Sequence, residues 1–300
     1  MITYGKFDLA DYADNLIVTD GNLQRLYDLH GDNVYVLPDG ERAKTFAEAE
    51  KLCKWFLHKG LTRNGRVVAV GGGSVGDLTG FAASIFMRGV SLTLVPTTLL
   101  AMVDSAIGGK NAVDLCGIKN AVGTFADTDT FVDVSFLQTL DETQLTSGLG
   151  EIVKYRMLGV NVPDDDIAEQ VKACAEYKLS LCKRDFYDRG ERHILNAGHT
   201  VGHALELFYN IPHGIAVADG LYYETEFALG LGICDKAFAD KWQNYIKQHF
   251  PLYKVTLSAL KNALHDKKNS SSDTICFMLA NGSGATKAEF TLQQATDILC

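Results

Sequence analysis

The chain has 300 residues, of which 47% are hydrophobic and 22% charged, the composition of a soluble globular protein large enough for two domains. Its net charge of −9 argues against a nucleic-acid-binding protein, which would usually present a basic surface, but leaves small anions as candidate ligands. No apolar run reaches the roughly 18 residues of a membrane span, residues 1–6 lack a signal-peptide pattern, and the seven scattered cysteines indicate reduced thiols, so we expect a cytoplasmic protein.

The first 140 residues predict an open α/β domain. Short apolar runs predict strands at 16–19, 34–37, 67–70, 92–95 and 131–134, and segments such as 43–59 and 77–87 between them have helical periodicity. Strands that are apolar on both faces are typical of a parallel sheet covered by helices. The alternation therefore predicts an open α/β nucleotide-binding architecture.

Polar segments follow three of these predicted strands, at 38–41, 71–77 and 96–98. In 71–77, consecutive glycines open a predicted helix, where free backbone N–H groups can bind a pyrophosphate. Each segment alone also fits an ordinary turn, and 71–77 is not the Gly-x-Gly-x-x-Gly pattern of Rossmann domains. Because all three lie at the carboxyl edge of one predicted sheet, together they favour a dinucleotide site.

Two further groups of charged residues lie near the middle of the chain. Lys110 and Lys119 stand among glycines and short polar residues, where loop lysines can bind phosphate oxygens or remain solvated. Glu151 and Lys154 are three residues apart on a predicted helix. That spacing fits a metal-bound carboxylate beside a substrate-facing ammonium, and it equally fits a surface ion pair.

After residue 141 the pattern becomes mainly helical. Helices are predicted at 142–157, 166–184, 191–209, 214–231 and 235–248, with one hairpin formed by 274–279 and 288–290. We therefore expect an α/β domain at 1–140 and a helical domain at 141–300, facing each other across a cleft that binds ligand.

The helical half concentrates histidines. His199 and His203 are four residues apart and share a face of the predicted helix, and His213 follows ten residues later. Two imidazoles and one carboxylate would leave an open position on a divalent metal, as in catalytic zinc sites. The pair lacks the Glu of the zinc-protease motif, and such pairs also occur in purely structural roles.

Taken in order, these segments resemble the 3-dehydroquinate synthase family over about residues 18–269. The resemblance rests on 39–41, 72–81, 87–90, 96–101, 104–110, 119–120, 151–154, 196–206 and 213–214. It implies an N-terminal domain that binds NAD and a helical domain that binds zinc, with cobalt as the alternative metal. It also implies the shikimate-pathway reaction that converts 3-deoxy-D-arabino-heptulosonate 7-phosphate to 3-dehydroquinate and phosphate.

The resemblance also implies roles for individual residues. The zinc ligands would be Glu151, His199 and His213. The NAD contacts would be Asp20, Asn22, Asp39, Gly40, Glu41, Lys44, Gly73, Ser74, Val75, Gly76, Asp77, Thr97, Thr98, Lys110, Lys119, Phe136, Leu137, Gln138 and Thr139. The residues at the substrate hydroxyls and reacting carbons would be Asp104, Lys154, Asn196 and His203, the last as a proton relay. The substrate carboxylate would be held by Lys178 and Arg192. The phosphate would be held by Lys110, Asn120, Lys267 or Lys268, and Arg88 of a neighbouring subunit, which implies a homodimer.

Lys178 and Arg192 favour a carboxylated substrate over those of related cyclases that make deoxy-inosose or valiolone compounds. The alternatives are such a cyclase, an NAD- and metal-dependent alcohol dehydrogenase, and a catalytically silent homologue. The dehydrogenase would not need these two cations.

The chain departs from the family pattern by being short at its N-terminus and near 160–166. It also has Ala43 in place of a larger residue, Ala197 in place of an aromatic one, and Ile215 where Glu is common. The last change removes one possible outer partner of a metal ligand.

Overall fold

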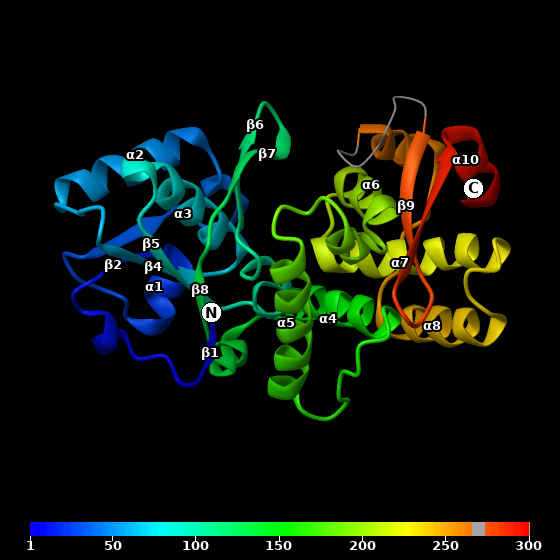
Figure 1. Cartoon of the computed structure of the whole chain (residues 1–300), viewed down its shortest axis with the longest axis horizontal. Coiled ribbons are helices and arrows are strands. Elements are labelled where there is room, and N and C mark those ends of the chain that lie inside the picture. Colours follow the sequence, from blue (N-terminus) through cyan, green and yellow to red (C-terminus); the bar gives the residue numbers. More distant parts are fainter. Residues whose placement is uncertain (266–273, 300) are drawn as a thin grey trace. The chain divides into compact units, whose positions relative to one another are not determined.

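The computed structural model describes residues 1–265 and 274–299, which form two compact units (Figure 1). The first unit contains 1–141 together with 178–187, and the second contains 142–177 and the described residues after 187. Segment 178–187 belongs to the first unit because its aromatic rings pack there, with Phe186 and Tyr187 5.8 and 5.5 Å from the ring of Phe125. The sequence pattern had placed this segment in the helical domain.

A parallel six-stranded sheet forms the centre of the first unit, in the order β1-β8-β5-β4-β2-β3. Its strands are β1 (Ile2–Tyr4), β2 (Leu16–Asp20), β3 (Val34–Leu37), β4 (Arg66–Gly71), β5 (Ser91–Pro96) and β8 (Asp129–Val132). The predicted fold class and its five predicted strands are confirmed. Strand β1 was missed because its three residues are too few to show a periodicity.

Helices α1 (Gly21–Tyr27), α2 (Phe46–His58) and α3 (Gly73–Ile85) connect the strands. Alternate strand residues such as Val18 and Ala69 pack with Leu52, Phe56 and Leu78 of α2 and α3 in one buried cluster. Each fully buried side chain of the size of Leu or Phe contributes about 1.5–3 kcal/mol. This core fixes the strand ends from which the polar segments emerge.

An antiparallel hairpin, β6 (Lys110–Leu115) with β7 (Ile118–Phe125), completes the first unit. The predicted loop positions of Lys110 and Lys119 are wrong, because both residues lie on these strands. Cys116 and Gly117 both have positive φ angles, 52° and 79°, and a two-residue turn of this kind joins hairpin strands with the correct twist.

The second unit is built around α7 (His213–Gly230), which contacts α4, α6, α8 and β9. Its other elements are α4 (Glu142–Met157), α5 (Ile167–Arg184, shared with the first unit from Lys178), α6 (His199–Tyr209), α8 (Lys236–His249), α9 (Leu257–Leu260), α10 (Leu292–Leu299) and the hairpin β9 (Thr274–Ala280) with β10 (Ala285–Thr291). The predicted hairpin is therefore present.

The predicted single helix at 191–209 is wrong. Residues Glu191–Asn196 form a short 3₁₀ helix, η6, and α6 begins only at His199. Gly198 between them has a φ of +77°, a left-handed conformation that breaks the helix. Within the described part of the chain, no helix is long and apolar enough to span a membrane.

Candidate metal centre and cofactor site

Glu151 and Lys154 lie in a stretch of α4 that is buried on all sides. Both are at most 1% exposed, and Lys154 Nζ is 2.5 Å from Glu151 Oε2. The surface ion pair considered above is therefore excluded. Removing two charges from water costs several kcal/mol per ion, so a buried pair of this kind is more typical of a functional site than of a stabilising one.

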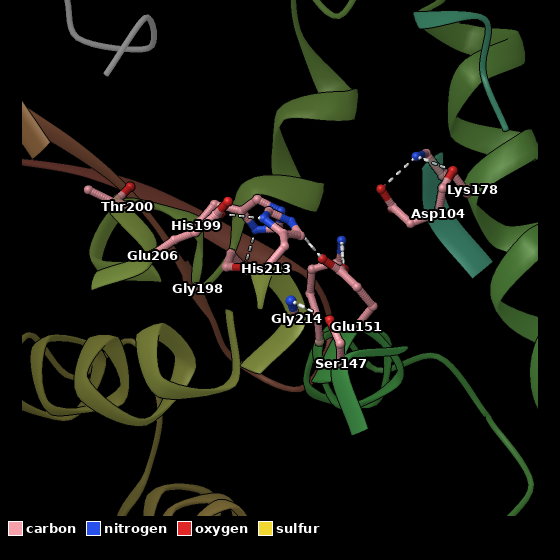
Figure 2. Close-up of polar contacts among 12 residues, drawn as sticks. Asp104, Ser147, Glu151, Lys178, Gly198, His199, Thr200, Glu206, His213 and Gly214 are labelled. Carbon is pink, nitrogen blue, oxygen red and sulfur yellow. Dashed lines mark hydrogen bonds and ion pairs between the residues drawn. The ribbon is translucent and has the colours of Figure 1, made fainter. Parts of the chain in front are cut away.

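Two histidines, His199 and His213, lie beside Glu151 (Figure 2), and His203 lies beside both of them. The Nε2 atoms of His213 and His199 lie 3.3 and 3.6 Å from the same oxygen, Glu151 Oε1. The His203 ring packs against both of the other rings, with centroids 5.2 Å from His199 and 5.5 Å from His213. One ring nitrogen from each histidine lies within 4.8 Å of the other two.

This donor set fits a divalent cation. Ligands bound to zinc at about 2.1 Å in a tetrahedron lie about 3.4 Å apart, close to both distances from Glu151 to the histidines. Nitrogen and carboxylate donors also match the ligands that zinc takes in catalytic sites. His199 and His213 both approach Oε1 of Glu151, so these three residues form one set of donors. His203 lies beside the two histidine rings.

Glu206 orients His213. The Nδ1 atom of His213 donates to Glu206 Oε2 at 2.8 Å, which turns Nε2 toward Glu151. Burial lowers the pKa of His213, but the hydrogen bonds to Glu151 and Glu206 outweigh it and raise the pKa to about 10. The cluster thus favours positive charge at this point, whether from an imidazolium or from a metal ion.

Sequence reasoning missed Glu206, although a signal was present. Glu206 lies seven residues after His199 on the same predicted helix, and seven residues return to the same helix face. Helix α6 thus supplies His213 with an outer carboxylate partner, although Ile215 carries none.

Glycines bring the two ligand-bearing helices together. A Cβ atom on Gly150 of α4 would overlap the carbonyl of Gly214 of α7, and one on Gly214 would overlap the carbonyl of Ser147. The Gly214 N–H donates to Ser147 Oγ at 3.0 Å across the same contact (Figure 2). Because Glu151 and His213 are the chain neighbours of these glycines, the backbone contact places them side by side.

The predicted cofactor segments collect at one edge of the parallel sheet. Strand β2 ends at Asp20, β4 ends one residue before Gly72, and β5 ends one residue before Thr97. Asp39 follows β3, the edge strand beside β2. The carboxyl edge of an open α/β sheet is where such folds bind ligands.

Hydrogen bonds link these segments. Ser74 Oγ donates to Glu41 Oε2 at 3.0 Å, and the Asn22 N–H donates to Asp39 Oδ1 at 3.0 Å. Beside them is a shallow pocket in the first unit lined by Gly71, Gly72, Gly73, Gly76, Asp77, Pro96, Ser105 and Asn111, among others. Glycines on its wall leave the backbone accessible, as a bound pyrophosphate requires.

Lys44 connects the cofactor segments to the hairpin. Its Nζ atom lies 2.9 Å from Asp77 Oδ2 and 3.6 Å from Glu41 Oε2, and it donates to Asn120 Oδ1 at 2.6 Å. Burial lowers the pKa of Lys44, whereas the carboxylates of Asp77 and Glu41 raise it by a larger amount. The net shift of the pKa is upward, so the ammonium stays charged. Lys44 thus holds the loop after β3, the first turn of α3 and strand β7 in one arrangement.

The other predicted NAD contacts are spread over the first unit. Residues 136–139 belong to a 3₁₀ helix after β8, where the hydroxyls of Thr139 and Tyr27 lie 2.7 Å apart. Lys119 is exposed on β7.

The residues predicted to bind substrate anions occupy both units. In the first, Lys178 Nζ donates to the Asp104 backbone carbonyl at 2.7 Å and lies 2.9 Å from its carboxylate (Figure 2). Lys110 is exposed at the start of β6. In the second, Arg192 and Asn196 both lie on η6, and Arg192 is buried.

Arg88 is exposed in a turn whose residues Met87 and Arg88 both have positive φ, 49° and 68°. Two consecutive left-handed residues other than glycine carry strain that is often associated with function. Lys267 and Lys268 lie outside the described residues.

Comparison with known proteins identifies the family. A model of the 3-dehydroquinate synthase N-terminal domain matches residues 34–147, and one of the C-terminal domain matches residues 146–269. The 3-dehydroquinate synthase of Alkaliphilus metalliredigens is 35% identical over 94% of this chain and 87% of its own. The chain belongs to the 3-dehydroquinate synthase family. The Picrophilus torridus 3-dehydroquinate synthase is also 35% identical, over 96% of this chain and 92% of its own.

Solved structures show the same fold. A 2-deoxy-scyllo-inosose synthase complexed with carbaglucose-6-phosphate, NAD⁺ and Co²⁺ has a TM-score of 0.84 at 24% identity, covering 99% of this chain and 95% of its own. The 2-epi-5-epi-valiolone synthase of Streptomyces hygroscopicus, with NAD⁺ and Zn²⁺ bound, has a TM-score of 0.83 at 23% identity, covering 99% and 94%. An iron-containing alcohol dehydrogenase from Thermococcus thioreducens is more distant, with a TM-score of 0.66 at 14% identity, covering 100% and 97%.

The structure brings together the three residues that the resemblance implies as metal ligands. Glu151, His199 and His213 converge although 62 residues separate the first from the last. The departures at Ala197 and Ile215 fall beside these residues without removing one of them.

Proposed function

We propose that the protein is a 3-dehydroquinate synthase that converts 3-deoxy-D-arabino-heptulosonate 7-phosphate to 3-dehydroquinate and phosphate. The observation that carries the proposal is the buried cluster of Glu151, His199 and His213 beside Lys154, in a chain that matches both family domains. Such a cluster can hold a metal ion that acts directly on a substrate oxygen.

Zinc and NAD⁺ are the cofactors we propose, with cobalt as the alternative metal. When bound, they would supply a Lewis acid for a substrate oxygen and a reversible hydride acceptor. Glu151, His199 and His213 would hold the metal, and the glycine-lined edge after β4 would hold the dinucleotide. Two fold relatives were solved with NAD⁺ and Co²⁺ or Zn²⁺, which supports this pairing.

The remaining polar residues would orient the substrate. Lys154 Nζ, held beside Glu151, would stabilise negative charge on a substrate oxygen, and a ring nitrogen of His203 would relay a proton. Asp104 and Asn196 would bind hydroxyls. Because the departing phosphate can accept the C–H proton itself, no further protein base is required.

We assign the substrate carboxylate to Lys178 and Arg192 and the phosphate to Lys110, Asn120 and Arg88 of a partner subunit. The contact of Lys178 with Asp104, which we place at the substrate hydroxyls, supports its position at the substrate. Exposure of Arg88 in a strained turn supports its use by a neighbouring copy, and hence a homodimer. We place the enzyme in the cytoplasm, consistent with the free cysteines of the described chain.

The test is a direct assay. Purified protein is incubated with NAD⁺, Zn²⁺ and the heptulosonate phosphate, and released phosphate and dehydroquinate are measured, with metal-chelated protein as the control. We expect equal amounts of both products from the metal-loaded protein alone. Turnover of glucose 6-phosphate or sedoheptulose 7-phosphate, with none of the heptulosonate, would assign the protein to another cyclase.

A further inference from the structure

Glu224 of α7 holds the first turn of α6. Its side chain is buried, and its carboxylate accepts three backbone N–H groups from the neighbouring helix. Oε2 accepts from Gly198 at 2.8 Å, and Oε1 accepts from Thr200 at 3.1 Å and Val201 at 3.0 Å.

This arrangement is a helix cap supplied from another helix. The first N–H groups of an α-helix have no partner within it, and a side chain at the preceding residue usually accepts one of them. The residue before α6 is Gly198, which has no side chain to do so. A carboxylate at this end also interacts favourably with the helix dipole, which offsets part of the cost of burying Glu224.

The capped turn contains a proposed metal ligand. His199 lies between Gly198 and Thr200, and Glu224 holds the N–H groups of both. The Nδ1 atom of His199 lies 3.1 Å from the carbonyl oxygen of Ala197 in the same turn, which directs Nε2 toward Glu151. The backbone and the ring of His199 are thus fixed by one local structure.

Gly220 shows how closely α7 approaches this turn. It lies one helical turn before Glu224, and a Cβ atom at Gly220 would overlap the carbonyl of Gly198. On this face of α7, Gly220 leaves space for the turn, and Glu224, one helical turn later, accepts its N–H groups. At Gly220 the nearest atom of this turn is the carbonyl oxygen of the residue just before His199.

We infer that Glu224 is a positioning residue that sets the orientation of His199 toward the metal. The inference rests on the proposed function, in which His199 binds that metal. Glu224 acts through the backbone of the turn, and its role is separate from general stabilisation of the fold because it determines where one ligand atom lies.

The test compares Glu224→Gln and Glu224→Ala with Glu226→Gln, an exposed residue of the same helix that interacts with Gln243. The glutamine side chain keeps an oxygen that accepts the N–H groups of Thr200 and Val201, but its NH₂ group faces the N–H of Gly198 and cannot accept it. The alanine side chain removes all three hydrogen bonds. Each full-length protein is loaded with Co²⁺, its visible absorption spectrum is recorded, and its Co²⁺ dissociation constant is measured by chelator competition.

We expect Glu224→Gln to weaken Co²⁺ binding about 10- to 100-fold and to change its absorption bands, the usual effect of losing an outer partner of a metal ligand. Glu224→Ala should do more, Glu226→Gln should match the wild type, and NAD⁺ affinity should be unchanged in all three. If Glu224→Ala does not fold, Glu224→Gln decides the question.

A wild-type spectrum and affinity in Glu224→Gln, with only a lower melting temperature, would overturn the inference. A wild-type protein that binds Co²⁺ but does not turn over the heptulosonate would overturn the proposed function alone. A wild-type protein without Co²⁺ binding would overturn both.

Discussion

Asp219 is a buried acid in the middle of α7 whose ionisation should destabilise the second unit. The side chain is fully buried, Oδ2 accepts the Tyr253 N–H at 3.0 Å, and Oδ1 has no hydrogen-bond partner among the described residues. Burial raises the pKa of this carboxyl from 3.8 to about 7, with the Tyr253 N–H opposing the shift. The folded protein therefore retains the Asp219 proton at pH values where the unfolded chain loses it.

The sign and size of the effect follow from this difference. Because the pKa of Asp219 is higher in the folded protein, its bound proton contributes to the free energy of unfolding. This contribution is complete below about pH 4 and is lost as the pH rises to about 7. A difference of about 3 pKa units, at about 1.4 kcal/mol each, corresponds to about 4 kcal/mol. Asp219→Asn keeps the shape and an acceptor for Tyr253 but cannot ionise. It should raise the free energy of unfolding by up to this amount at pH 8 and change it little at pH 4.5.

The assay is urea unfolding followed by tryptophan fluorescence between pH 4.5 and pH 8.5. All variants carry Trp55→Phe, so that the fluorescence comes from Trp242 and reports the unfolding of the second unit. Asp240→Asn, an exposed carboxylate that pairs with Lys236, is the control and should not change the pH dependence. Parallel pH curves for the wild type and Asp219→Asn would refute the reasoning.

Three further outcomes concern the proposed sites. Glu206→Gln should weaken zinc binding about 10- to 100-fold in a calorimetric titration, because a metal ligand loses its outer carboxylate; unchanged affinity would contradict that role. Gly214→Ala should lower both the melting temperature and zinc affinity by separating α4 from α7, while Gly230→Ala, which has open space around it, should do neither. Lys178→Ala should reduce kcat/KM for the heptulosonate by at least about 30-fold, the effect of removing about 2 kcal/mol of ion-pair binding, without changing NAD⁺ affinity. Exposed Lys183→Ala is its control, and equal activity of the two variants would remove Lys178 from the substrate site.

The sheet and the His199/His203 pair could be predicted from the sequence because each leaves a local pattern. Buried parallel strands appear as short apolar runs, and strands β2 to β5 and β8 were found in this way. His199 and His203 are marked by helical spacing. The combination of Glu151 with the distant His213 came from the family resemblance, since no local pattern connects them.

Other features depend on contacts that no local pattern records. Glu224 caps a turn 26 residues away, and only the packing of α6 on α7 brings the two together. The break at Gly198 was missed because the apolar periodicity continues across it, and a single glycine is compatible with a helix. The β6–β7 hairpin was missed because Cys116 at a left-handed turn position is unusual, and its strands carry many polar residues.

The contact between Gly150 and Gly214 limits how closely Glu151 and His213 can approach each other. Two helices that touch through main-chain atoms cannot move closer, so the spacing between Glu151 and His213 has a lower limit set by atomic radii rather than by side-chain packing. Side chains elsewhere in the second unit can change without compressing the site. Its dimensions depend instead on two positions that carry no side chain at all.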